Sequence, residues 1–179
     1  MLIGRNCFNQ SVSKIRYKYL EMLDNHTFRT VLKNTPLVSI DICLVYENKM
    51  LLGKRNREPL KGQWFTPGGR ILKNESWQDC LRRVAHSELG FSVDDIGAFV
   101  LMGVWDHFYP NSAIDNDIST HYVNLPHYCF LARQPVLVPD DQHEGLMWFD
   151  LKEMMDNKSF HEYMRIYASL LLNIGNKND

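Results

Sequence analysis

A loop rich in glycine and proline leads into a segment that contains neither residue, and this junction constrains the fold more than any other feature. The loop reads NREPLKGQWFTPGG, residues 56–69, and such a composition is typical of irregular backbone. Residues 75–89 then place apolar side chains near one face and stop before Gly90, a common helix terminator. The apolar side chains are Trp77, Leu81, Val84 and Leu89. The pattern predicts an amphipathic helix over 75–89.

The segments around this helix alternate between strand and turn patterns. The run LVSIDICLV (37–45) is β-branched and apolar, YENK is a turn, and MLLGKR (50–55) returns, which together predict a β-hairpin. A polar loop is expected over 110–119. Further strands are predicted over 98–105 and 120–131 and in the short runs PVLV (135–138) and MWFD (147–150).

Two more segments have helical spacing of apolar residues. One or two short helices are expected over 11–32, with a break at His26 and Thr27, and another over 160–173. Strands and helices in this order predict an α+β fold, an α-β-α sandwich. A chain of 179 residues without a linker fits a single domain over 1–179, in which 1–34 form an N-terminal helical extension.

Charge and cysteine content exclude several classes of protein. The net charge of −1 argues against a broad nucleic-acid or membrane surface, so any bound phosphate needs a local site. Four scattered cysteines without a CxxC pair argue against zinc or a disulfide framework. No signal peptide and no apolar run of ~20 residues is present, which predicts a cytoplasmic protein.

Five residues match most of the Nudix box, G-x5-E-x7-R-E-U-x-E-E-x-G-U with U a bulky apolar residue: Gly69, Glu75, Arg83, Glu88 and Gly90. The full box places three glutamates on one helical turn, where they hold divalent ions against a diphosphate. Here the three positions are Val84, Ser87 and Glu88, so one carboxylate remains. The alternative interpretation makes Glu75 a residue favoured by the helix dipole, and makes Arg83 and Glu88 solvated surface charges.

The sequence around the box resembles the GDP-mannose mannosyl hydrolases, a branch of the Nudix superfamily with a depleted box. The resemblance covers roughly residues 35–150 in six segments: TPLVSID (35–41), LLGKR (51–55), WFTPGGR (64–70), GVWDHFY (103–109), THYV (120–123) and PDDQH (139–143). It implies the Nudix fold, a mixed β-sheet flanked by helices. It also implies hydrolysis of GDP-mannose, and of GDP-glucose, at the anomeric carbon with inversion, by a homodimer acting in polysaccharide biosynthesis.

The resemblance further implies one Mg²⁺ per subunit, replaceable by Mn²⁺, with three oxygen ligands. These are the backbone carbonyl of Gly68, the carboxylate of Glu88 and the side-chain oxygen of Gln142, a donor set that suits a hard cation. His143, next to Gln142, is expected to be the general base, because an unperturbed pKa of about 6.5 suits proton removal from water near neutrality.

The same resemblance assigns the remaining site residues to the two halves of the substrate. Arg55, Arg70 and Tyr122 are expected to bind the departing diphosphate, and Asp41 and His107 to face the sugar. Arg55 could instead end a strand at the surface, Tyr122 could be a half-buried strand aromatic, and His107 could lie at the edge of the core. Asp41 lies in an apolar strand and is a candidate functional residue even without the resemblance, because a buried carboxylate without a partner is costly.

His86 and His121 are interpreted as structural, and Trp77, Trp105 and Trp148 as core residues. Two rival functions remain open. A pyrophosphatase that attacks phosphorus is disfavoured because Val84 and Ser87 replace two carboxylates. A non-catalytic module that senses a nucleotide sugar is disfavoured because a metal ligand set and a base are both retained, and because no DNA-binding segment is present.

Overall fold

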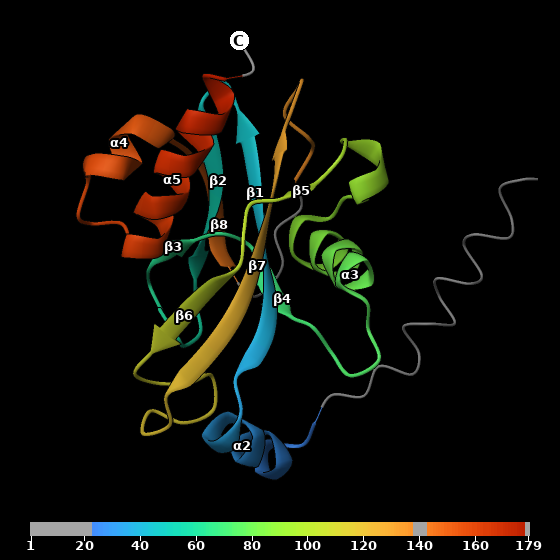
Figure 1. Cartoon of the computed structure of the whole chain (residues 1–179), viewed down its shortest axis with the longest axis vertical. Helices are drawn as coiled ribbons and strands as arrows, with labels where there is room; N and C mark the ends of the chain where they lie inside the picture. The colour runs from blue at the N-terminus through green and yellow to red at the C-terminus, as the bar shows by residue number, and fades with distance from the viewer. Residues whose placement is uncertain (1–22, 138–142, 178–179) are drawn as a thin grey trace, which may run out of the picture.

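Eight strands form one mixed sheet within residues 23–137 and 143–177, the part of the chain that the computed structural model describes (Figure 1). The strands are β1 Leu37–Tyr46, β2 Lys49–Arg55, β3 Trp64–Phe65, β4 Gly68–Arg70, β5 Val100–Leu101, β6 Trp105–Tyr109, β7 Thr120–Phe130 and β8 His143–Asp150. The main order is β3-β2-β1-β7-β5, while β4 pairs with β1, β6 with β7 and β8 with β2.

The two central strands, β1 and β7, are parallel, and the other pairs are antiparallel. The register between β1 and β7 places Ser39 opposite Asn124 and Asp41 opposite Pro126. Parallel neighbours require a long crossover in the chain. The pairing therefore joins two segments that the sequence keeps far apart.

Helices cover both faces of the sheet (Figure 1). Helix α3 (Trp77–Leu89) packs on one face, and α4 (Leu151–Asp156) and α5 (Glu162–Gly175) pack on the other. Side chains along β1 alternate between the two cores: Ile40, Ile42 and Leu44 join the α3 side, whereas Cys43 and Val45 join the α5 side. The predicted sandwich, a mixed sheet between helices, is confirmed.

The predicted hairpin and the predicted central helix are also confirmed. The β1–β2 turn has positive φ at Glu47 and Asn48 (46° and 58°), as in a type I′ turn. Helix α3 starts two residues later than expected, because Ser76 caps its N-terminus, and it ends at Gly90 in the left-handed conformation, with φ of 74°.

The predicted break at His26 and Thr27 is wrong. Helix α2 (Asn25–Asn34) begins just before these residues, and the Asp24 side chain caps it by accepting from both of their backbone N–H groups. The helix lies at one end of the sheet (Figure 1). The rest of the predicted extension, residues 1–22, lies outside the described residues.

Several strand boundaries differ from the predictions. The expected strand over 98–105 is interrupted between β5 and β6, where Gly103 has φ of 150°. The 56–69 loop contains β3 and the start of β4, which form only by pairing with β2 and β1. No strand occurs at 135–137, and β8 is longer than MWFD. Helix α5 is shifted by two residues toward the C-terminus relative to the predicted 160–173. Helix α4, capped by Asp150, was not predicted.

The three tryptophans expected in the core differ in their surroundings. Trp105 and Trp148 pack against the two cores, as predicted. Trp77 is 40% exposed and stacks on His127, with 4.7 Å between ring centroids, so its assignment to the core is wrong. Of the described cysteines, Cys43, Cys80 and Cys129 are buried free thiols. No helix in the described ranges is long and apolar enough to cross a membrane.

Candidate active site

A cavity of about 450 Å³ opens between the sheet, the β2–β3 loop and α2. Its lining includes six residues that the sequence singled out: Asp41, Arg55, Gly68, Arg70, His107 and Tyr122. They come from five strands, β1, β2, β4, β6 and β7, whose pairing places them around one hollow. Five of these six side chains are polar or charged, which suits a charged, hydroxyl-rich ligand.

The three carboxylate positions of the Nudix box have different environments. Val84 is buried, and its Cγ2 would lie 3.0 Å from a Cβ at Gly69. The Ser87 hydroxyl donates back to the Val84 carbonyl of its own helix (3.3 Å). Glu88 is only 4% exposed, and its Oε2 accepts the Gly68 backbone N–H at 3.0 Å. The box therefore directs one carboxylate toward β4, next to the cavity.

Glu75 and Arg83 form a partly buried ion pair, so Arg83 is not the solvated surface charge of the alternative interpretation. The Glu75 carboxylate, 1% exposed, accepts from Arg83 Nε at 2.7 Å and Nη2 at 2.9 Å, and from the Leu72 backbone N–H at 2.9 Å. Arg83 Nη2 also donates to the Arg70 carbonyl at 2.9 Å. The pair therefore fixes the β4–α3 loop against the helix.

Gly68 lies where strand β4 approaches β1 too closely for a side chain. A Cβ there would be 2.5 Å from Asp41 Oδ1 and 2.6 Å from the Ile40 carbonyl. Gly68 begins β4, and this close contact with β1 requires glycine there.

The oxygen donors near Gly68 fit a hard divalent cation with few protein ligands. Glu88 could supply one carboxylate and Gly68 its carbonyl, and substrate oxygens and water typically complete such a shell. The described residues contain no group of three His, Cys, Asp or Glu side chains arranged for a metal. Gln142, the third predicted ligand, lies outside the described residues.

His143, the predicted general base, begins β8, and its backbone pairs with that of Arg55. Its side chain lies outside what the structure describes. The strand pairing nonetheless brings the start of β8 next to Arg55 at the end of β2. Arg55 lines the cavity.

Arg55, Arg70 and Tyr122, the residues predicted to bind the diphosphate, line this one cavity. Burial lowers the pKa of Arg70, and its guanidinium lies 4.0 Å above the Phe28 ring of α2. Arg55 Nε donates to the Pro59 carbonyl at 2.8 Å, which fixes the direction of its guanidinium. Burial raises the pKa of Tyr122, although Arg55 and Arg70 lower it. These groups can donate to the oxygens of a diphosphate. Phe28 was not predicted, because an aromatic residue on an amphipathic helix is typical of a core.

Asp41 is buried in the wall of the cavity. Burial raises the pKa of its carboxyl to about 6, while hydrogen bonds from Asn124 and Tyr167 and the charge of Arg55 lower it. Asn124 Nδ2 lies 2.5 Å from Asp41 Oδ2, and the Tyr167 hydroxyl lies 3.3 Å from the same oxygen. Neither partner was predicted, since Asn124 and Tyr167 belong to no local motif.

Both ring nitrogens of His107 have polar partners in the protein. Its ring is parallel to that of Tyr163, with centroids 3.8 Å apart, and Nδ1 and Nε2 lie 3.3 and 3.1 Å from the hydroxyls of Tyr109 and Tyr167. Burial, and then the nearby His161, lower the pKa of His107 to about 4. The ring is therefore neutral near pH 7, and the predicted contact with sugar hydroxyls stays a prediction.

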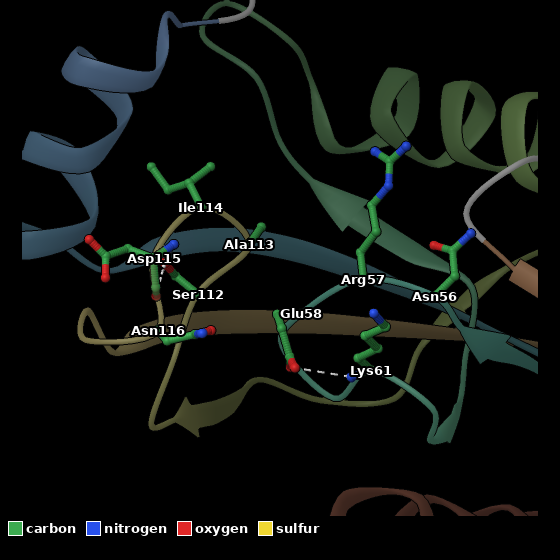
Figure 2. A pocket seen from close by; sticks show the side chains of 9 residues that line it. All are labelled: Asn56, Arg57, Glu58, Lys61, Ser112, Ala113, Ile114, Asp115 and Asn116. Atoms are coloured by element: carbon green, nitrogen blue, oxygen red, sulfur yellow. Dashed lines mark hydrogen bonds between the residues drawn. The ribbon is translucent and has the colours of Figure 1, made fainter.

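A second hollow of about 280 Å³ adjoins the cavity (Figure 2). Both are lined by Arg57, Glu58, Ala113 and Ile114. Figure 2 shows the Glu58 carboxylate turned toward Lys61, whose backbone N–H donates to it at 3.3 Å. The hollow lies between the loops that follow β2 and β6.

The fold and the box together define a class of protein. The NUDIX domain family matches residues 35–170, and the chain belongs to this family of hydrolases. Among its relatives, it is similar to the low-salt glycan biosynthesis protein Agl8 of Haloferax volcanii, with 35% identity over 80% of this chain and 87% of Agl8. It is also similar to an ADP-ribose pyrophosphatase of Methanocaldococcus jannaschii, with 27% identity over 92% and 91% of the two chains.

Solved structures share the fold. A MutT NUDIX hydrolase from Burkholderia pseudomallei has a TM-score of 0.60 and 28% identity, over 76% of this chain and 98% of its own. The NUDIX domain of Shewanella oneidensis NrtR, solved with ADP ribose, has a TM-score of 0.61 and 16% identity, over 88% and 96%. These matches agree with the predicted Nudix fold.

Proposed function

We propose that this Nudix protein hydrolyses GDP-mannose and related GDP-hexoses, such as GDP-glucose, at the anomeric carbon, giving GDP and the free sugar with inversion. One observation carries the proposal: the three clustered carboxylate positions of the box contribute only Glu88, while Asp41, Arg55, Arg70 and Tyr122 line the adjoining cavity.

This set of residues suits cleavage of the carbon–oxygen bond. When water attacks the anomeric carbon, positive charge develops on the sugar and negative charge on the departing GDP. Arg55, Arg70 and the Tyr122 hydroxyl can stabilise the diphosphate, so no carboxylic acid is needed to protonate it. Asp41, which lines the same cavity, can stabilise the cationic sugar.

The position of His143 supports its role as base. In an inverting reaction the base holds water on the face of the sugar opposite the leaving group. The backbone of His143 pairs with that of Arg55, a residue that lines the cavity, so the proposed base begins a strand next to the cavity. Bound by Glu88 and Gly68, a divalent cation such as Mg²⁺ would supply further neutralisation of the leaving diphosphate.

The relatives support two related activities. The name of the Haloferax protein places that relative in glycan biosynthesis, which suits an enzyme of nucleotide-sugar metabolism. The name of the Methanocaldococcus relative favours a second candidate, cleavage of a nucleoside diphosphate sugar at phosphorus. Against this candidate, Val84 and Ser87 leave two of the three box positions without a carboxylate. A homodimeric, cytoplasmic, single-domain enzyme remains part of the proposal, and light scattering tests the dimer.

The proposal is tested by hydrolysis in ¹⁸O-labelled water with Mg²⁺ and GDP-mannose, followed by mass spectrometry of the products. Label in free mannose and none in GDP supports attack at carbon. Label in GMP or mannose phosphate would establish the phosphorus-attacking candidate instead. Binding of GDP-mannose without any product would favour the sensor.

A further inference from the structure

A fully buried amide, Asn124 on β7, lies at the centre of a polar cluster behind the cavity wall. Its Nδ2 lies 2.5 Å from Asp41 Oδ2, 2.9 Å from the Tyr167 hydroxyl and 3.3 Å from His107 Nδ1. Its Oδ1 lies 3.0 Å from the Ser39 hydroxyl. The four partners come from β1, β6 and α5, so this amide connects three elements.

The partners determine which way the amide faces. A carboxylate oxygen accepts hydrogen bonds, so the group close to Asp41 has to be the amide NH₂. The other end is then the carbonyl oxygen, to which the Ser39 hydroxyl donates. The Ser39 hydroxyl could donate or accept, but a rotated amide would place two acceptor oxygens against each other beside Asp41, which is unfavourable in a buried site.

The orientation of the amide determines the protonation of the histidine ring. The NH₂ of Asn124 faces His107 Nδ1, so a proton on Nδ1 would oppose a second donor, and the favoured tautomer carries its proton on Nε2. Nε2–H then donates to the Tyr167 oxygen, and the Tyr167 hydroxyl donates to Asp41 Oδ2. The Tyr109 hydroxyl can donate to the unprotonated Nδ1.

We propose that Asn124 is a positioning residue of this site: its NH₂ group fixes the Nε2–H tautomer of His107 and, directly and through Tyr167, holds the Asp41 carboxylate by its Oδ2 atom. Asp41 Oδ1 then remains directed toward Gly68. The part of this inference that concerns catalysis rests on the proposed function, in which Asp41 faces the sugar. The tautomer does not depend on the substrate.

The packing around His107 supports a fixed ring. The ring lies parallel to Tyr163 with 5° between the planes and meets Phe65 edge-on at 88°. Its lowered pKa, about 4, keeps it neutral, so near pH 7 it exists as one of two tautomers. Because the stacked ring is neutral, its polar partners select between the two tautomers. The Tyr109 hydroxyl near Nδ1 can donate or accept, whereas the Asn124 NH₂ near Nδ1 can only donate.

The test uses long-range ¹H–¹⁵N NMR of full-length protein with ¹⁵N-labelled histidine, without substrate. His107 is expected as the Nε2–H tautomer in the unaltered protein. Asn124→Asp keeps the size of the side chain but presents an acceptor, so Nδ1 should become protonated. Asn124→Leu removes the donor, so the ¹⁵N shifts should move toward a mixture of tautomers. His127, whose Nδ1 lies 2.8 Å from the Leu125 carbonyl, is the internal control and should stay Nδ1–H throughout.

The catalytic part is measured with the same two variants. If Asn124 positions Asp41, kcat for GDP-mannose should fall on the order of 10-fold to 10²-fold while the Kd for GDP stays unchanged. An Nδ1–H tautomer in the unaltered protein, or an unchanged Nε2–H tautomer in both variants, overturns the proposal. A changed tautomer with unchanged kcat overturns the catalytic role. If the unaltered protein turns over no GDP-hexose, the proposed function fails, and the tautomer alone decides whether Asn124 controls His107.

Discussion

Glu88 Oε2 accepts a 3.0 Å hydrogen bond from the backbone N–H of Gly68, which connects the remaining carboxylate of the box to the strand that lines the cavity. The bond holds the carboxylate in a buried position where it would otherwise be costly. It also explains why this glutamate can have both a structural contact and a proposed metal contact, since a carboxylate accepts several hydrogen bonds or metal ligands at once.

Replacing Glu88 with glutamine should separate these two roles. The glutamine oxygen can still accept from Gly68, so we expect a folded protein with almost no Mg²⁺-dependent turnover. Turnover is measured against Mg²⁺ concentration, with a chelator as the metal-free reference. Unchanged activity and Mg²⁺ affinity in Glu88→Gln would place the metal elsewhere.

Glu75→Gln is the matched change at a box glutamate with a structural role. It removes the charge that pairs with Arg83, so the free energy of unfolding should fall by about 2 kcal/mol, the usual scale for hydrogen bonds between charged groups. Urea denaturation measures the loss. Mg²⁺ affinity should stay the same, and a large decrease in affinity would show that Glu75 also binds the metal.

Gly68→Ala should destabilise the protein and disturb the cavity. The new Cβ would lie 2.5 Å from Asp41 Oδ1 and 2.6 Å from a backbone carbonyl, so β4 or the carboxylate has to move, at a typical cost of roughly 1–3 kcal/mol. Gly145→Ala on β8 is the control, because a Cβ there meets no atom within 4 Å. Equal melting temperatures for the two variants would contradict the close approach of β4 and β1.

His143→Gln should lower kcat for GDP-mannose by roughly 10² to 10⁴, the usual contribution of a general base. The Kd for GDP, measured by calorimetry, should change little, because the base acts on water and not on the nucleotide. A large loss of GDP affinity would instead indicate that this histidine has a structural or binding role.

The pH dependence of stability should reveal the neutral histidine at position 107. An unfolded histidine takes up a proton below about pH 6.5, whereas the folded ring does so only near pH 4, so the free energy of unfolding should fall as pH decreases through this window. The full decrease is on the order of 3 kcal/mol. Asp41, with a pKa raised to about 6, has the opposite slope.

His107→Gln should remove the histidine component, so the difference between the two stability curves isolates it. Urea denaturation at several pH values between 4 and 7 gives these curves. A constant difference across this range would mean that His107 titrates normally in the folded protein.

Much of the fold could be predicted because its signals are local. The turn after β1, the end of α3 at Gly90 and the apolar, β-branched run of β1 each depend on a few neighbouring residues. The short strands β3 and β4 and the end of the 98–105 segment could not be predicted, because their pairing depends on partners far along the chain.

For the candidate site, the sequence by itself determined which residue types are present: one carboxylate at the three clustered box positions, Arg55 and Arg70, and an aspartate in an apolar strand. Only the tertiary structure decided which groups meet. The parallel pairing of β1 with β7 brings Ser39 and Asn124 together, and packing of α5 on the sheet adds Tyr167 to Asp41. Local composition cannot encode such contacts, because hydrogen bonds between distant segments form only after the apolar faces of sheet and helix have packed together.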